Sequence, residues 1–450
     1  MRLIYLAVAL TAFGASATDF NKHFTDSTLR VDYILGGKAG NVSVSMYGQS
    51  KSNGWAGRRH SLDKLPYIGN GQVTVIDKAS GDTLYRNSFS TLFQEWLATA
   101  EATTTPRAME HTVLVPLPQK PATINLTLLD SRHEVIAETS HLYRPDDELV
   151  GISKTNNVTP HKWLHKGGDS SKAIDVAILA EGYTPEEMDS FYSHAAVAVE
   201  EILSYEPFRS HRDCFNFVAV ATPSTESGVS VPRLKDWKDT AFSSHFSTFY
   251  SDRYLTTDKV FTINDVLQGI PYEHIIILAN TDEYGGGGIY NSYTLTAARH
   301  PMFRPVVVHE FGHSFGGLAD EYFYTGDIME DTYPQDVEPW EPNITTLRNF
   351  DSKWKSLLKP GTPVPTPADK ADKYPVGVYE GGGYSFKGVY RPADECRMRN
   401  NTYPTFCPGC SAALDNLIRF YTGKSQLPEI EGQCKKVVVK IRAKIINFVS

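Results

Sequence analysis

The stretch that most constrains this 450-residue chain is 309–322, which reads His-Glu-Phe-Gly-His-Ser-Phe-Gly-Gly-Leu-Ala-Asp-Glu-Tyr. His309 and His313 stand four residues apart, so on a helix both imidazoles project from one face and can bind one metal ion. Glu310 lies beside that face, where it can take a proton from water that a zinc ion has activated. Proline and apolar residues at 304–308 favour a helix, and Gly316-Gly317 ends it. The pattern predicts a catalytic zinc site.

A tetrahedral catalytic zinc needs a third protein ligand, and the carboxylates after the glycine pair are the candidates. Asp320, seven residues after His313, is the favoured ligand, and its neighbour Glu321 is the alternative. If Asp320 binds the ion, Glu321 orients a ligand or forms a salt bridge. If both are surface charges, the third ligand lies further along the chain, with Glu330 the weaker candidate.

Five cysteines raise a separate question. Cys396, Cys407 and Cys410 lie close together in the sequence, whereas Cys214 and Cys434 are distant from each other. A disulfide within the cluster is the leading prediction for an exported protein. A second zinc held by Cys407 and Cys410 is an alternative that lacks an obvious second ligand pair, and a thioredoxin-like redox role has less support.

Residues 1–17 have the features of a signal peptide: a basic start at Met1-Arg2, an apolar run over 3–13, and Ala15-Ser16-Ala17 before the cleavage point. The alternative is a buried strand or helix. No other segment is long and apolar enough to span a membrane, so we expect an exported protein that is secreted, periplasmic or on the cell surface. The net charge of −8, with no basic block, argues against a nucleic-acid partner.

The chain divides near residue 150. Residues 18–145 predict an all-β sandwich domain, because short alternating runs separated by glycine turns occur at 41–47, 71–77, 111–117 and 123–129. No catalytic cluster occurs in this region. Its aromatic residues, including Phe93 and Trp96, pack in a core or domain interface, or else contact a glycan or host protein.

Residues 146–172 are polar and aperiodic, which predicts a linker. Residues 173–450 then predict an α/β (α+β) catalytic domain. Strands are expected at 173–180, 216–221, 274–279 and, at the carboxyl end, 439–445; helices are expected at 184–203 and 411–421.

Four glycines at 285–288 precede an alternating run over 289–296. This run predicts an edge strand beside the metal that can hold an extended peptide by main-chain hydrogen bonds. The alternative is an ordinary sheet strand next to a mobile glycine loop. Tyr322 and Tyr324 are candidates for stabilising the oxyanion of the attacked carbonyl, or are packing residues.

The string 309–322, together with Asp175–Tyr183, Cys396–Arg399 and Cys407–Cys410, resembles the IgA-peptidase family of zinc metallopeptidases, which is metzincin-like. The resemblance covers about 170–423, and the amino-terminal sandwich is similar to the family's accessory domain. It implies that His309, His313 and Asp320 bind zinc, that Glu310 is the general base, and that Met398 forms the turn beneath the metal. The usual metzincin string places its third ligand six residues after the second histidine, where this chain has Ala319.

These inferences predict a secreted zinc metalloendopeptidase with one catalytic Zn²⁺ and Glu310 as the residue that activates water. Its substrate is a protein or peptide, with host glycoproteins or immunoglobulins suggested by the family name. The alternatives are an exported glycan- or protein-binding module with a vestigial metal site, and a zinc hydrolase of a non-peptide substrate.

Overall fold

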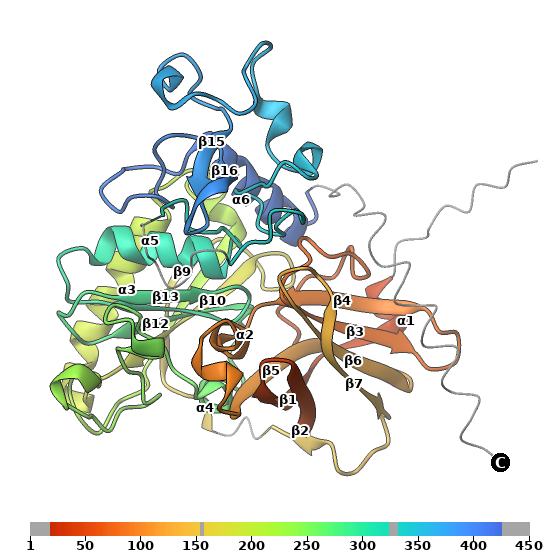
Figure 1. Ribbon diagram of the computed structural model, residues 1–450. Coiled ribbons are helices and arrows are strands. Elements are labelled where there is room, and N and C mark those ends of the chain that lie inside the picture. The colour runs from red at the N-terminus through yellow and green to blue at the C-terminus, as the bar shows by residue number, and fades with distance from the viewer. Residues whose placement is uncertain (1–18, 154–156, 324–331, 425–450) are drawn as a thin grey trace, which may run out of the picture.

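The computed structural model describes residues 19–153, 157–323 and 332–424 (Figure 1). The predicted signal peptide, the strand expected at 439–445, and the candidates Tyr324, Glu330 and Cys434 lie outside these residues. Within them, no helix has the length and apolar character needed to cross a membrane.

Two four-stranded sheets make up the amino-terminal region. One has the order β5-β1-β2-β8 and the other β4-β3-β6-β7. The first contains β1 (Phe24–Lys38), β2 (Asn41–Asn53), β5 (Arg107–Pro118) and β8 (Gly151–Ile152); the second contains β3 (Gly71–Asp77), β4 (Thr83–Phe89), β6 (Ala122–Leu129) and β7 (Val135–Tyr143). Two short helices, α1 (Phe20–His23) and α2 (Leu92–Leu97), accompany them.

The alternation of apolar and polar residues in this region arises because one face of each sheet is buried in a shared core. In β3, every second residue is buried, beginning with Gly71. Buried residues of both sheets, together with Phe93 and Trp96 of α2, form one hydrophobic cluster. The strands predicted at 41–47, 71–77, 111–117 and 123–129 are confirmed, and the two aromatic residues are core residues.

The second half is built on a six-stranded sheet of order β13-β14-β12-β10-β11-β9. The strands are β9 (His161–Lys166), β10 (Ile174–Glu181), β11 (Phe215–Val220), β12 (His274–Ala279), β13 (Gly286–Ile289) and β14 (Tyr293–Ala297). The four inner strands run parallel, and the edge strands β9 and β13 run antiparallel to their neighbours. The inner strands are buried throughout, as expected for a sheet covered on both faces.

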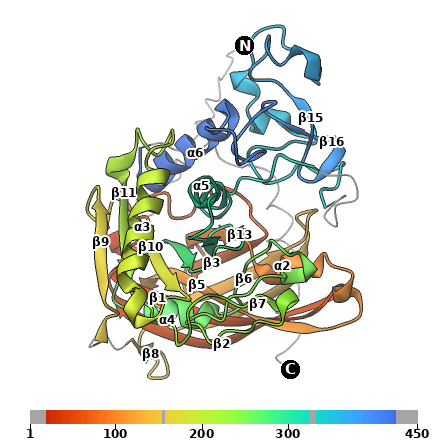
Figure 2. The ribbon, with the colours of Figure 1, turned by 90° about the vertical axis from the view of Figure 1, so that its left-hand side faces the viewer.

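Helices cover the two faces of this sheet (Figures 1 and 2). One face packs against α3 (Met188–Ile202), α5 (Phe303–Ser314) and α6 (Pro408–Tyr421) in a single core. The opposite face packs against α4 (Val260–Val266). The strands predicted at 173–180, 216–221 and 274–279 and both helices are therefore confirmed, and the chain is a mixed α and β protein.

The region after α5 is mostly irregular. It contains the hairpin of β15 (Tyr379–Gly382) and β16 (Ser385–Arg391), which lies on the α5 side of the sheet in Figure 1.

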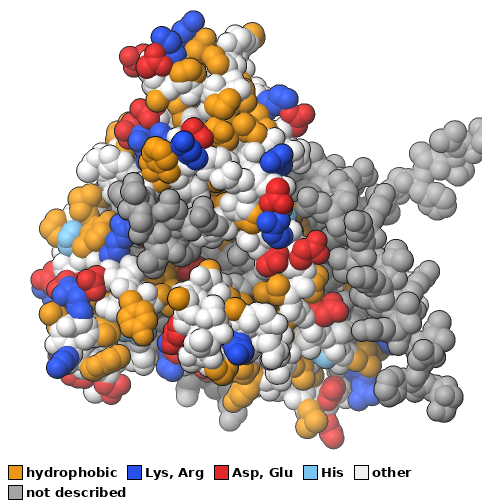
Figure 3. Space-filling view, in the orientation of Figure 1, with side chains coloured by type: hydrophobic (Ala, Val, Ile, Leu, Met, Phe, Trp, Pro, Cys, Tyr) orange, Lys and Arg blue, Asp and Glu red, His pale blue; other side chains and the backbone are white. Residues whose placement is uncertain are grey.

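Short 3₁₀ helices occur along the whole chain, at Glu101–Thr103, Pro185–Glu187, Arg212–Cys214, Pro232–Leu234, Thr248–Tyr250, Phe350–Ser352, Lys355–Leu357 and Ala368–Lys370. On the face drawn in Figure 3, acidic and basic side chains of the described residues are interspersed.

Two expectations need correction. The segment 146–172, predicted to be a linker, contains β8 and β9, and β9 is an edge strand of the second sheet. The run 289–296, predicted to be an edge strand, instead contains the internal strand β14, and the edge is the glycine strand β13. Glycine fits there because a side chain would collide with α5, which Figure 2 shows end-on above β13.

Candidate functional site

Helix α5 carries the two histidines and is anchored by its apolar side. Val306, Val307 and Val308 are buried, and Phe311 stacks on Phe315 at a centroid distance of 5.1 Å. Below the helix, a β-carbon at Gly312 would lie 2.8 Å from Met398 Sδ. The glycine therefore allows the fully buried Met398 to pack directly against the helix.

A tight turn after α5 reverses the chain. Gly317 has a φ of +60°, a conformation that favours glycine, and the Leu318 amide donates to the Gly312 carbonyl at 3.1 Å. Asn343, which is fully buried, then holds Ala319 by accepting from its amide at 2.7 Å and donating to its carbonyl at 2.9 Å. This clamp places Asp320 beside the helix that the chain has just left.

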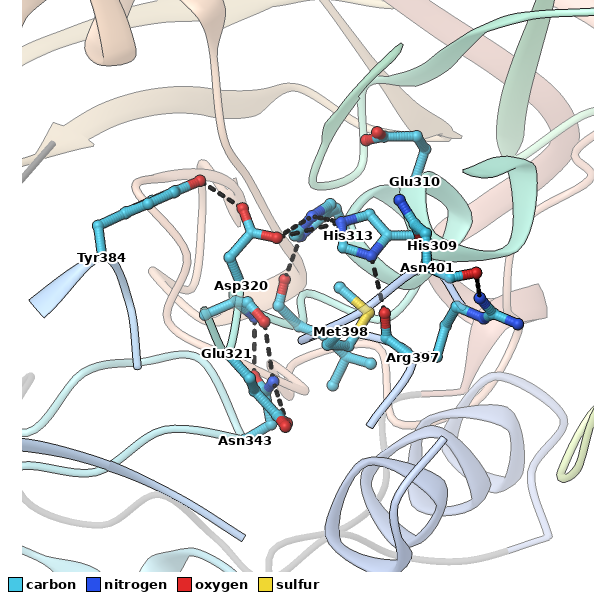
Figure 4. A network of polar contacts seen from close by, with 12 residues as sticks. His309, Glu310, His313, Asp320, Glu321, Asn343, Tyr384, Arg397, Met398 and Asn401 are labelled. Carbon is cyan, nitrogen blue, oxygen red and sulfur yellow. Dashed lines mark hydrogen bonds and ion pairs between the residues drawn. The ribbon is translucent and has the colours of Figure 1, made fainter. Parts of the chain in front are cut away.

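The ligand atoms of His309, His313 and Asp320 converge on one point (Figure 4). The two Nε2 atoms are 3.0 Å apart, and Asp320 Oδ1 lies 3.1 Å from His309 Nε2 and 3.3 Å from His313 Nε2. Bonds of about 2.0–2.1 Å in a zinc tetrahedron separate neighbouring ligand atoms by about 3.3 Å. The three residues therefore fit a zinc ion, with Asp320 in the third position.

Hydrogen bonds fix the orientation of all three groups. His309 Nδ1 donates to the Arg397 carbonyl at 3.0 Å, and His313 Nδ1 donates to the Leu318 carbonyl at 2.6 Å, because a carbonyl can only accept. In its neutral form, each ring therefore presents an Nε2 lone pair to the centre. Tyr384 donates to Asp320 Oδ2, while Oδ1 is buried and accepts no hydrogen bond within the described residues.

The electrostatics of this cluster favour positive charge at its centre. Burial opposes the charged forms of His313 and Asp320. The attraction of Asp320 nevertheless raises the pKa of His313 to about 9. The same attraction by the histidines overcomes burial and holds the pKa of Asp320 well below its usual value. A bound cation takes the place of the proton in such a cluster.

The side chain of Glu310 extends from α5 to the glycine strand β13. Burial raises its pKa, while the neighbouring His309 and His313 act in the opposite direction. A β-carbon at Gly286 would lie 2.7 Å from Glu310 Oε1, and one at Gly288 would lie 2.4 Å from the Glu310 carbonyl oxygen. The absence of side chains at Gly286 and Gly288 thus leaves room for a carboxylate suited to proton transfer.

A cleft of about 1290 Å³ opens over these groups, and both halves of the chain line it. Glu95, on α2 of the amino-terminal region, accepts a hydrogen bond from Tyr254, and both line the cleft. Burial raises the pKa of Glu95 to about 7. Tyr322 also lines the cleft, with its ring centroid 5.5 Å from that of Tyr384.

Three of these residues were missed by the sequence-based reasoning. Glu95 belongs to the half in which no catalytic cluster was predicted, whereas Asn343 and Tyr384 follow Asp320 by 23 and 64 positions, in an irregular segment and a hairpin. No local motif marks any of them.

Glu321, the alternative third ligand, points away from the histidines (Figure 4). It lies instead with Cys396, Cys407 and Cys410 in a second buried group. All four described cysteines are free, and Cys396 Sγ lies 3.7 Å from Cys410 Sγ, compared with about 2.05 Å in a disulfide. The predicted disulfide within the cluster is therefore not present in the structure.

Two family models match separate ranges of the chain. Residues 163–375 match the model described as IgA Peptidase M64, and residues 19–140 match the model described as Peptidase M64 N-terminus. The first range includes the two histidines, Glu310 and Asp320 and ends before Met398 and the cysteine cluster. Comparison with curated proteins gave no match.

Proposed function

Because the chain belongs to the IgA peptidase M64 family and is a peptidase, we propose that it is a zinc-dependent endopeptidase with His309, His313 and Asp320 as metal ligands. The observation that carries the proposal is the convergence of three oriented ligand atoms at separations of 3.0–3.3 Å. When bound, zinc supplies a Lewis acid that polarises the scissile carbonyl and acidifies water.

Glu310 is the general base in this proposal. Its carboxylate lies next to the first histidine ligand and between α5 and β13, where its raised pKa suits it to accept a proton from water and return it to the leaving amine. Tyr322, which lines the cleft, is the candidate donor to the developing oxyanion.

The substrate binds as an extended segment along β13. On the side of β13 that faces away from β14, Gly286 already forms two main-chain hydrogen bonds. Its amide donates to the Arg253 carbonyl and its carbonyl accepts from the Leu255 amide, each at 3.3 Å. Main-chain groups of alternate residues in a strand point to the same side, so Gly288 directs its amide and carbonyl outward as well. We expect Gly288 to pair with the main chain of the substrate beside the catalytic groups.

Glu310→Gln tests the base. The variant keeps the size of the side chain and should retain zinc while cleavage of an unstructured protein such as casein falls by about 10²–10⁴-fold. Glu186→Gln, at an exposed position away from the cleft, is the matched control. Cleavage by wild type should also stop on chelation and return with added zinc. Near-normal turnover by Glu310→Gln would contradict the proposal that Glu310 is the general base.

Export and the finer fold assignment are part of the same proposal. The basic, apolar and small-residue segments of 1–17 support a signal peptide cut after Ala17, and amino-terminal sequencing of protein recovered outside the cytoplasm tests this. Recovery of uncleaved chain would contradict it. The two amino-terminal sheets with a common core support a β-sandwich accessory domain, and Met398 beneath α5 supports a metzincin-like peptidase domain.

Immunoglobulins and other host glycoproteins remain the proposed substrate class, on the basis of the family description alone. Incubation of purified protein with immunoglobulin A and with a peptide library separates hinge cleavage from a different specificity. Cleavage of the library without cleavage of the immunoglobulin would contradict this substrate class and leave the peptidase assignment intact.

A further inference from the structure

We infer that Glu321, Cys396, Cys407 and Cys410 bind a second zinc ion, separate from the catalytic one, which fastens the metal-binding turn to α6. The four side chains are buried, and one ligand atom from each lies within 4.8 Å of the others. Three sulfur atoms and one carboxylate oxygen are all donors that zinc accepts, and four protein ligands are the number that structural zinc sites have.

The sulfur spacing fits a metal better than a disulfide. With Zn–S bonds of about 2.3 Å, neighbouring sulfurs of a tetrahedral site lie about 3.8 Å apart. The distance between Cys396 Sγ and Cys410 Sγ is 3.7 Å. No rearrangement of these two side chains is needed to accept the ion, and thiol protons leave to solvent as it binds.

The carboxylate of Glu321 provides an independent sign of a missing ligand. Its side chain is fully buried, and Oε1 accepts from Asn343 Nδ2 at 3.0 Å and from the Cys410 thiol at 2.9 Å. Within the described residues, Oε2 is buried and accepts no hydrogen bond. A buried carboxylate with an unsatisfied oxygen is costly, and a divalent cation among the sulfurs removes that cost.

Backbone amides lie close to two of the three sulfurs, Cys396 Sγ and Cys407 Sγ. The Cys407 amide lies 3.2 Å from Cys396 Sγ and the Met398 amide 3.5 Å from the same sulfur. Cys407 caps the amino terminus of α6, and its sulfur accepts from the Cys410 amide at 3.5 Å. Amide donors and a helix amino terminus both stabilise the thiolate form that zinc requires.

The location explains what the second ion does. Glu321 follows Asp320 directly, and the Glu321 amide donates to the Met398 carbonyl at 2.9 Å. The four residues therefore connect the turn that carries Asp320, the segment that carries Met398, and the start of α6. The second ion is a positioning element for the catalytic centre and takes no part in proton transfer.

Zinc content of the purified full chain, prepared without chelator, tests the inference. Wild type should hold two zinc ions per chain and His309→Ala/His313→Ala should hold one. Cys407→Ser and Cys410→Ser should each lose one ion, whereas Cys214→Ser, a buried cysteine outside the group, should keep both.

The double histidine variant keeps the test valid if the cysteine variants do not fold. Reconstituted with cobalt(II), it should show sulfur-to-cobalt charge-transfer absorption. The inference is overturned if this variant binds no metal, or if peptide mapping of non-reduced protein finds Cys396 joined to Cys410. If instead the double variant holds as much zinc as wild type, the catalytic site proposed above fails while the cysteine site stands.

Discussion

Replacing Tyr384 with Phe removes one hydrogen bond from Asp320, the buried residue proposed as the third metal ligand, and changes little else. The phenol donates to Asp320 Oδ2, and the other oxygen of that carboxylate faces the two histidines. A hydrogen bond to a buried charged group contributes about 1.5–3 kcal/mol. At about 1.4 kcal/mol per tenfold change, the zinc affinity of Tyr384→Phe should fall by about 10–100-fold.

Competition with a chelator of known affinity measures this loss directly. Tyr379→Phe is the matched control, because Tyr379 lies in the same hairpin and donates to the Tyr374 carbonyl instead of to a metal ligand. We expect the control to bind zinc as wild type does. Equal zinc affinity in Tyr384→Phe and wild type would refute the idea that Tyr384 orients the third ligand.

Three further changes address the strand, the turn and the core. Gly288→Ala should abolish cleavage and destabilise the fold by about 1–3 kcal/mol, because the new methyl group would lie 2.4 Å from the Glu310 carbonyl oxygen. Denaturant unfolding measures this loss, with Gly48→Ala as the control because a methyl group there meets open space. Asn343→Ala should lower the free energy of unfolding by about 2–4 kcal/mol by removing three buried hydrogen bonds, and unchanged stability would contradict the clamp. Burial lowers the pKa of His111 to about 3, so the unfolded chain binds a proton near pH 5 that the folded chain does not, and stability must fall as the pH drops below about 6.5. This amounts to about 2 kcal/mol between pH 7 and pH 5, and His111→Leu should reduce that slope whereas His161→Leu, at an exposed position, should not.

Sequence patterns predicted the elements whose burial is regular. Strand β3 alternates between buried and half-buried residues, and β12 is apolar after His274; both were predicted with the bounds that the structure has. Strand β9 was missed because it pairs on one side only and exposes much of its surface, so its sequence, His-Lys-Trp-Leu-His-Lys, lacks both patterns. The glycine strand β13 was not predicted as a strand, because glycine normally disfavours strands; here close contact with α5 outweighs that preference.

The histidine pair could be predicted because one helical turn fixes its geometry locally. The groups that complete the site come from elsewhere in the chain. Tyr384 lies 64 residues beyond Asp320, and Glu95 reaches the cleft from a different sheet system. Contacts of this kind depend on how elements pack against each other, and spacing in one sequence carries no information about that packing.

The choice between Asp320 and Glu321 as the third ligand also depends on packing that sequence spacing does not reveal. Both are buried carboxylates next to each other, and spacing alone allowed either to reach the histidines. In the structure the two carboxylates lie in different groups: Asp320 faces the two imidazoles, and Glu321 faces the three cysteine sulfurs. A cysteine cluster that begins 75 residues beyond Glu321 thus determines which way the second carboxylate points. If the cysteine group binds zinc as inferred, the metal there holds Glu321 in place, and because the two residues are joined through one peptide bond, it also limits how far Asp320 can move from the catalytic centre.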